Sequence, residues 1–176
     1  MADFDVPNLK DFIEIPKIQE AAMAHSQPFV ASEDHQKALG FPGELTDGWE
    51  NRAIDKFGDL LGKYRSLQVY MDSCVNCGAC TDKCHYFLGT GDPKNMPVAR
   101  QNLMRQVYRR YFTFAGKWFP WLVGAKDMTK KVLDDWYSYF HQCSQCRRCA
   151  VYCPYGIDTA EISMAAREIM DSVGQG

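Results

Sequence analysis

Apolar side chains recur every three or four residues in four segments of the chain, which is the spacing of one helix face. The first segment predicts a helix that starts near Asp47 and delivers the chain to Cys74. A glycine-rich turn over residues 88–93 separates it from the second helix, for which Pro97 suits the first turn. The apolar positions of these two helices are Trp49, Ala53, Phe57, Leu60 and Leu61, then Ala99, Leu103, Val107 and Tyr111.

Two further helices follow in the second half of the chain. One has Asp127 as its expected cap and ends near Cys143, and the other has Asp158 and Glu161 at the offset of a capping box and ends before Gly174. No segment shows sustained alternation of apolar and polar residues. The pattern therefore predicts an all-α body with no sheet. The apolar positions are Val132, Trp136 and Phe140, then Ile162, Ala166, Ile169 and Val173.

Residues 1–48 lack this periodicity and are interrupted by prolines and glycines, which favours an extended amino-terminal arm before a helical domain over 49–176. The acidic start of the chain leads into no apolar stretch, so we expect neither a secretory signal nor a transit peptide. The longest aromatic and apolar stretch, 118–125, is far shorter than the roughly 20 residues that span a bilayer. We therefore expect a cytoplasmic protein without a membrane span of its own.

The chain has 176 residues and a formal net charge of -2. This length normally gives one domain with a core of its own. The near-neutral charge supplies no excess of lysine and arginine for a phosphate backbone, so no nucleic acid partner is expected. The chain also holds eight cysteines. In a reducing compartment these stay thiols, and patterned thiols there indicate metal binding or catalysis.

All eight cysteines fall in two motifs of the form C-x2-C-x2-C-x3-C, the second followed by proline. Ferredoxins with two [4Fe-4S] clusters use this spacing, and the fourth cysteine of each motif ligates the other cluster. We assign cluster A to Cys74, Cys77, Cys80 and Cys153, and cluster B to Cys143, Cys146, Cys149 and Cys84.

A pair of structural zinc sites in an interaction module is the alternative, although four-cysteine zinc sites usually combine two C-x2-C pairs. The spacer of 58 residues between Cys84 and Cys143 is predicted to be helical. We therefore expect an α-helical ferredoxin, in which the two cysteine loops lie between packed helices.

The text around the cysteines is more specific than the motif itself. Residues 74–87 read CVNCGACTDKCHYF, residues 88–100 read LGTGDPKNMPVAR, and residues 141–170 read HQCSQCRRCAVYCPYGIDTAEISMAAREIM. Over about residues 65–173 the chain resembles the α-helical ferredoxin domain shared by succinate dehydrogenase iron-sulfur subunits and the C subunit of heterodisulfide reductase. More narrowly, it is similar to the heterodisulfide-reductase-like DsrK family of the DsrMKJOP membrane complex of sulfur metabolism.

The resemblance implies an electron relay. In that family a membrane cytochrome b subunit exchanges electrons with quinone, two clusters conduct them, and a carboxy-terminal domain with CCG motifs acts on a disulfide carried by a small DsrC-like protein. This chain has no adjacent pair of cysteines, so we expect a relay without a catalytic site of its own. It is either the amino-terminal ferredoxin portion of such a subunit or a relay subunit whose catalytic half is a separate polypeptide. DsrMKJOP-type partner subunits are expected to hold it at the inner face of the membrane. The alternative is a relay subunit of another respiratory dehydrogenase or of a heterodisulfide reductase.

The two cysteine loops differ in charge. Gly78 and Ala79 of the first correspond to Arg147 and Arg148 of the second, and Gly78 suits a left-handed backbone close to a cluster. Cations favour the addition of an electron to an anionic cluster, so one hypothesis gives cluster B the higher potential. The alternative is that both arginines point into solvent, where screening removes the effect.

Two further features leave alternatives open. His85 stands where the first motif would have its proline, and it either assists cluster B through Cys84 or, as we favour, closes the loop with a backbone hydrogen bond. An aromatic stretch is expected to pack in the core and shield the clusters, with a partner anchor as the alternative. Its members are Tyr111, Phe112, Phe114, Trp118, Phe119 and Trp121.

Overall fold

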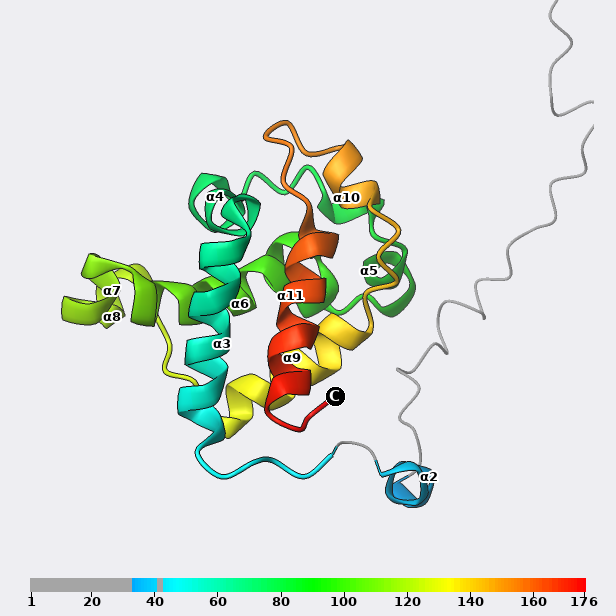
Figure 1. Cartoon of the computed structure of the whole chain (residues 1–176). Coiled ribbons are helices and arrows are strands. Elements are labelled where there is room, and N and C mark those ends of the chain that lie inside the picture. The colour runs from blue at the N-terminus through cyan, green and yellow to red at the C-terminus, as the bar shows by residue number, and fades with distance from the viewer. Residues whose placement is uncertain (1–32, 41–42) are drawn as a thin grey trace, which may run out of the picture.

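The computed structural model describes residues 33–40 and 43–176, and these contain helices but no strand (Figure 1). The predicted all-α fold class is confirmed. Most of the expected arm, residues 1–32 and 41–42, lies outside the described residues. The helices are α2 (Glu33–Leu39), α3 (Trp49–Lys63), α4 (Arg65–Ser73), α5 (His85–Thr90), α6 (Pro97–Phe112), α7 (Phe114–Trp118), α8 (Pro120–Val123), α9 (Lys130–His141), α10 (Arg148–Val151) and α11 (Thr159–Ser172), with 3-10 turns η2 (Thr81–Lys83) and η3 (Pro93–Asn95).

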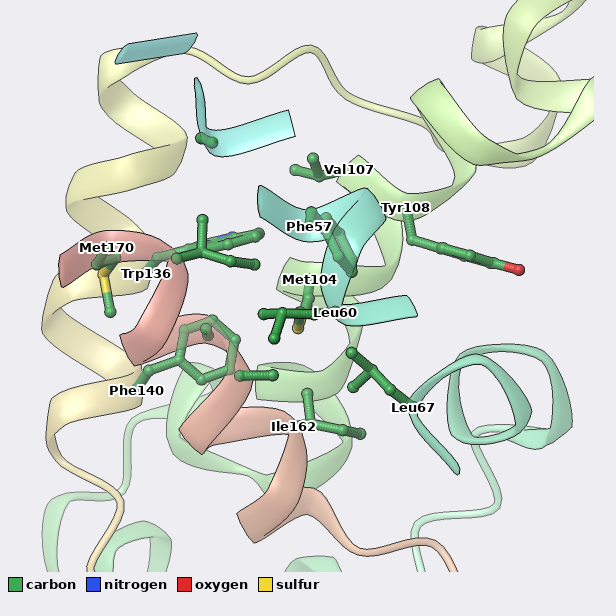
Figure 2. Close-up of a cluster of buried hydrophobic side chains, with 14 of the residues drawn as sticks. Phe57, Leu60, Leu67, Met104, Val107, Tyr108, Trp136, Phe140, Ile162 and Met170 are labelled. Atoms are coloured by element: carbon green, nitrogen blue, oxygen red, sulfur yellow. The ribbon is translucent and has the colours of Figure 1, made fainter. Parts of the chain in front are cut away.

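Four helices, α3, α6, α9 and α11, build the core, and α11 packs against the other three (Figure 1). Their buried side chains interlock between the helices, as Figure 2 shows. Full burial of a large apolar side chain contributes about 1.5–3 kcal/mol each. The largest fully buried side chains include Trp136, Phe57, Phe140, Leu60, Met104 and Ile162. None of the helices in the described residues is long and apolar enough to cross a bilayer.

The helix expected from Asp47 to Cys74 is two helices. The chain breaks at Tyr64, whose backbone is extended, and Gly48 rather than Asp47 takes the N-cap position of α3. The buried positions Phe57, Leu60, Leu67 and Met71 keep helical spacing across the break, so periodicity alone cannot reveal it. The expected turn over 88–93 is also partly helical, because α5 extends to Thr90 and ends at Gly91 in a left-handed conformation.

Of the caps predicted for the last two long helices, one is confirmed and one is wrong. Asp158 caps α11 as predicted, since its carboxylate accepts hydrogen bonds from the backbone of Ala160 and Glu161. At α9 the cap is Thr129, whereas Asp127 forms an ion pair with Arg110. The second half of the expected capping box fails too, because the Glu161 side chain accepts a hydrogen bond from Ser66.

The buried face of α6 differs from the predicted one. Leu103 and Tyr111 are only half-buried. Polar residues occupy much of the buried face, because hydrogen-bond partners lie there. The two cysteine motifs supply them to Arg100 and Arg105, and the carbonyl oxygen of Tyr70 in α4 supplies one to Gln101. The buried residues of α6 are Pro97, Arg100, Gln101, Met104, Arg105, Val107 and Tyr108.

The expectation that the aromatic stretch packs in the core is wrong for four of its six members. Tyr111 and Phe112 are half-buried at the end of α6. Beyond them α7 and α8 project from the body as a short helical pair, at the far left in Figure 1. We call residues 113–126 the prong. The exposed aromatic residues on it are Phe114, Trp118, Phe119 and Trp121.

We predict that Gly116→Ala disrupts the attachment of the prong. A β-carbon at Gly116 would lie 1.7 Å from the backbone oxygen of Arg109 on α6, and no side-chain rotation relieves a backbone clash. Overpacking of this kind typically costs about 1–3 kcal/mol, so the thermal midpoint should fall. Gly62→Ala is the matched control, because nothing lies within 4 Å of its β-carbon. An unchanged midpoint for Gly116→Ala would contradict the close packing of α7 on α6.

Candidate metal centres

The two cysteine motifs meet beside the first turns of α6 and α11, where they line two neighbouring pockets. Each pocket has about 350 Å³ of space free of protein atoms, open solvent included. All eight cysteines are free thiols. The first pocket is lined by Cys84, Cys143, Cys146 and Cys149, and the second by Cys74, Cys77, Cys80 and Cys153, with Cys149 also at its wall. The fourth cysteine of each motif thus lies with the three leading cysteines of the other.

Both loops have the same unusual backbone. The residues on either side of the second cysteine have positive φ in each motif, namely Asn76 and Gly78 in the first, and Gln145 and Arg147 in the second. A left-handed conformation costs a residue other than glycine about 1–2 kcal/mol. Such strain persists where the surrounding structure requires it, and it is concentrated at functional sites. The expected left-handed conformation of Gly78 is therefore present, and the non-glycine residues of the second loop adopt it as well.

An arginine from the following long helix fixes the start of each loop. Arg105 of α6 donates a hydrogen bond to the carbonyl oxygen of Cys74 at 2.8 Å, and Arg167 of α11 donates to that of Cys143 at 2.5 Å. Each arginine is the ninth residue of its helix. The two halves of the site are therefore built in the same way, with a cation held beneath the first cysteine of each motif.

Arg100 adds a third cation to the site, on one side only. It is 2% exposed, and its guanidinium group lies 3.7 Å from the sulfur of Cys84 and 2.7 Å from the side-chain oxygen of Asn95. Its Nε atom has no hydrogen-bond partner, and no carboxylate among the described residues pairs with it. A buried charge is costly unless it is paired. An anionic group in the adjacent thiol pocket would supply that pair.

Burial changes the acidity of two thiols, one that lines the second pocket and one that lines both pockets. It raises the pKa of Cys80 to about 11, and it raises the pKa of Cys149 in the same direction. Without metal these groups remain protonated at neutral pH. Because metal ligands must be thiolates, loading either pocket releases protons.

The donor set and its layout fit iron-sulfur clusters. Thiolates select zinc and iron-sulfur clusters among biological metal groups. In the described part of the chain, however, no three His, Cys, Asp or Glu side chains converge closely enough to hold one metal ion. Four thiols spread around a pocket suit a cluster with iron atoms at several corners better than one tetrahedral zinc ion.

Exposure distinguishes the corners of the two pockets. The middle cysteines of the leading triplets, Cys77 and Cys146, are exposed. By contrast, Cys149 and Thr159 line both pockets and form a shared wall. Each site therefore has one corner at the surface and one boundary with the other site.

His85 lies against the second loop. One ring nitrogen is 3.2 Å from the hydroxyl of Ser144 and the other is 4.0 Å from the sulfur of Cys146. We had favoured a hydrogen bond to the backbone. Both contacts are instead with side chains across the pocket. His85 therefore joins the first motif to the second.

Arg147 and Arg148 line the same pocket but extend into solvent. The Arg147 side chain is 62% exposed and pairs with Asp158 at 3.3 Å, and Arg148 is exposed. Screening weakens the effect of exposed charges. Sequence reasoning missed the buried Arg100. Its position on the same helical face as Met104 and Val107 was the available signal, since a charged residue on an apolar face needs a partner.

An all-helical chain with two four-thiol pockets defines the class of two-cluster, ferredoxin-like proteins. Residues 70–157, half of the chain, match the model of the 4Fe-4S dicluster domain family, and the chain belongs to that family. It is thus an iron-sulfur protein.

The similar proteins are heterodisulfide-reductase-like. The chain is 54% identical over 131 residues to "Hdr-like menaquinol oxidoreductase iron-sulfur subunit 2" of Archaeoglobus fulgidus, which is 74% of this chain and 24% of that protein. It is 52% identical to the corresponding protein of Archaeoglobus profundus, again over 74% of this chain and 24% of that protein. It is 28% identical over 106 residues to one subunit of a dihydromethanophenazine:CoB--CoM heterodisulfide reductase of Methanosarcina barkeri, which is 60% of this chain and 25% of that protein.

The chain therefore spans about a quarter of the length of the curated relatives it matches. No solved structure matches it. The predicted resemblance to heterodisulfide-reductase-like iron-sulfur subunits is confirmed, and the relatives do not single out the DsrK family within that group.

We predict that Gly78→Ala destabilises the first loop through its backbone alone. The β-carbon has room, since its nearest neighbour is Thr81 Oγ1 at 3.7 Å, but φ is +78°. The left-handed conformation should lower the free energy of unfolding by about 1–2 kcal/mol. Gly62→Ala, at an open helical position, should instead raise it by about 0.5–1 kcal/mol. Thermal unfolding under anaerobic conditions measures both, and equal shifts would contradict a strained loop.

Proposed function

We propose that the chain relays single electrons through two [4Fe-4S] clusters, one in each thiol pocket. The observation that carries the proposal is the grouping of four free thiols around each pocket, with the fourth cysteine exchanged between motifs. When bound, each cluster accepts and releases one electron at a time. The proposed ligands are Cys74, Cys77, Cys80 and Cys153 for cluster A, and Cys143, Cys146, Cys149 and Cys84 for cluster B.

The protein residues give this relay its path. Cys149 and Thr159 line both pockets, so the two proposed clusters share this wall. The exposed Cys77 and Cys146 are the corners at which partner proteins approach. Electrons thus enter at one loop, cross the shared wall and leave at the other loop.

The partners are inferred from the relatives and from the family resemblance. A menaquinol-linked membrane cytochrome b subunit is the proposed electron donor or acceptor, in keeping with the names of the relatives that are 54% and 52% identical. The other end of the relay is a thiol-disulfide site outside this chain, because all eight cysteines are assigned to clusters. A DsrC-like disulfide carrier in sulfur metabolism is the narrower proposal, and a heterodisulfide reductase is the alternative.

Metal analysis tests the relay. Protein purified without oxygen should hold about eight iron and eight sulfide per chain, absorb in the visible and show two reducible centres by EPR. Cys84→Ser should perturb the centre built on the second motif, and Cys153→Ser the centre built on the first. A colourless protein that holds zinc would refute the proposal, and so would perturbation of the same-motif centre by each variant.

Arg100 sets the two clusters apart within this proposal. Arg105 and Arg167 hold equivalent carbonyls in the two halves, so each half has one such cation. Arg100 is an additional cation, buried beside Cys84, where solvent screens it little. Since a nearby cation favours the reduced cluster, cluster B should have the higher potential.

We predict that Arg100→Gln lowers the midpoint potential of cluster B and leaves cluster A nearly unchanged. Arg100→Lys keeps the charge and should restore most of the difference, which a purely structural role would not do. The matched control is the double variant Arg147→Ala with Arg148→Ala, which removes exposed charges from the same pocket and should have a smaller effect. EPR-monitored redox titration measures all three. Equal shifts for Arg100→Gln and the double variant would contradict the assignment.

A further inference from the structure

The prong presents a cluster of apolar side chains that nothing in the described chain covers. Exposed apolar patches mark sites of interaction with proteins or membranes, and two rings of the prong, Phe114 and Trp118, lie with their centroids 6.0 Å apart. Figure 1 shows α7 and α8 beyond the end of α6, away from the four-helix core. The exposed side chains and their exposed fractions are Phe114 (77%), Trp118 (68%), Phe119 (51%), Trp121 (79%) and Leu122 (68%).

The base of the prong is firmly attached, so this exposure is not the result of a frayed end. Arg109 of α6 donates a hydrogen bond to the backbone oxygen of Val123 at 2.8 Å. The backbone nitrogen of Lys126 donates to the carbonyl oxygen of Gln106 at 3.1 Å. Gly116 packs so closely on α6 that no β-carbon fits. The fold therefore holds the aromatic side chains outward.

The composition of the prong favours a lipid surface over a protein. Residues 113–126 contain Lys117 and Lys126, both exposed, and no acidic residue. Tryptophan, phenylalanine and leucine accompanied by lysine are typical of segments that lie in the headgroup region of a bilayer.

We propose that the prong inserts its aromatic side chains into the interface of a bilayer that contains anionic lipid. Lys117 and Lys126 attract the anionic headgroups, and Trp118, Trp121 and Leu122 enter the boundary between headgroups and acyl chains. Insertion through the prong is shallow and needs no membrane span.

Attachment through the prong also orients the chain. A pocket of about 420 Å³, open solvent included, is lined by Asn76 of the first cysteine loop and by Val123 and Gly124 at the end of α8. The first loop and the prong are therefore neighbours. If the proposed relay function holds, cluster A is the one nearer the membrane and the quinol-linked partner. Insertion itself does not depend on that function.

Vesicle binding of the full, cluster-loaded chain tests the proposal. Under anaerobic conditions the protein should cosediment with vesicles of phosphatidylcholine and phosphatidylglycerol, and more weakly with phosphatidylcholine alone. Tryptophan fluorescence should shift to the blue and be quenched by lipids brominated on the acyl chains. The double variant Trp118→Ser with Trp121→Ser should lose about tenfold or more in binding. Lys117→Gln and Lys126→Gln should each lose about fivefold on the anionic vesicles.

The control removes exposed apolar side chains elsewhere on the surface. Val69→Ser with Leu88→Ser changes two exposed residues outside the prong and should leave vesicle binding intact. Equal losses in the control and prong variants, or no binding to either vesicle, would overturn the proposal. Capture of a purified cytochrome b subunit that requires Trp118 and Trp121, without vesicle binding, would make the prong a protein interface instead. Iron content of the same samples reports separately on the relay function.

Discussion

The exchange of the fourth cysteine between motifs is the constraint on which the rest of the structure depends. It requires two segments separated by 58 residues to lie side by side. Closing so long a loop has an entropic cost, which the burial of α3, α6, α9 and α11 offsets. The same core sets the first turns of α6 and α11 beside both pockets, so a single packing arrangement positions all eight thiols.

Sequence reasoning succeeded where one local signal was sufficient. Pro97 and Asp158 begin their helices as predicted, because a fixed φ and a carboxylate cap act within one turn. It failed where the outcome depends on distant partners. The break at Tyr64 leaves the apolar periodicity intact, and the burial of Arg100 depends on where Cys84 lies. The local sequence around an aromatic residue does not show whether its side chain is buried or exposed. The exposure of the aromatic residues of the prong therefore could not be predicted.

The side chains that stabilise the fold and the apolar side chains that are exposed lie in different parts of the molecule. The core of α3, α6, α9 and α11 is apolar and lies apart from the exposed prong, so stability does not rely on the aromatic residues that face outward. Polar burial is concentrated instead at the cysteine loops, where three arginines point inward. The arginines at the cysteine loops thus lie where anionic clusters are proposed, and the exposed apolar side chains of the prong lie where a bilayer is proposed.

Arg105 and Arg167 occupy matching positions in their helices and hold matching carbonyl groups, so the two halves of the site share one arrangement. Two identical halves would make the clusters equivalent, and an electron would then rest on either with equal preference. The fourth residue of each long helix breaks this symmetry, since α6 has Arg100 where α11 has the buried Ile162. In the proposed relay, this difference at one helical position favours an electron on the cluster beside Arg100.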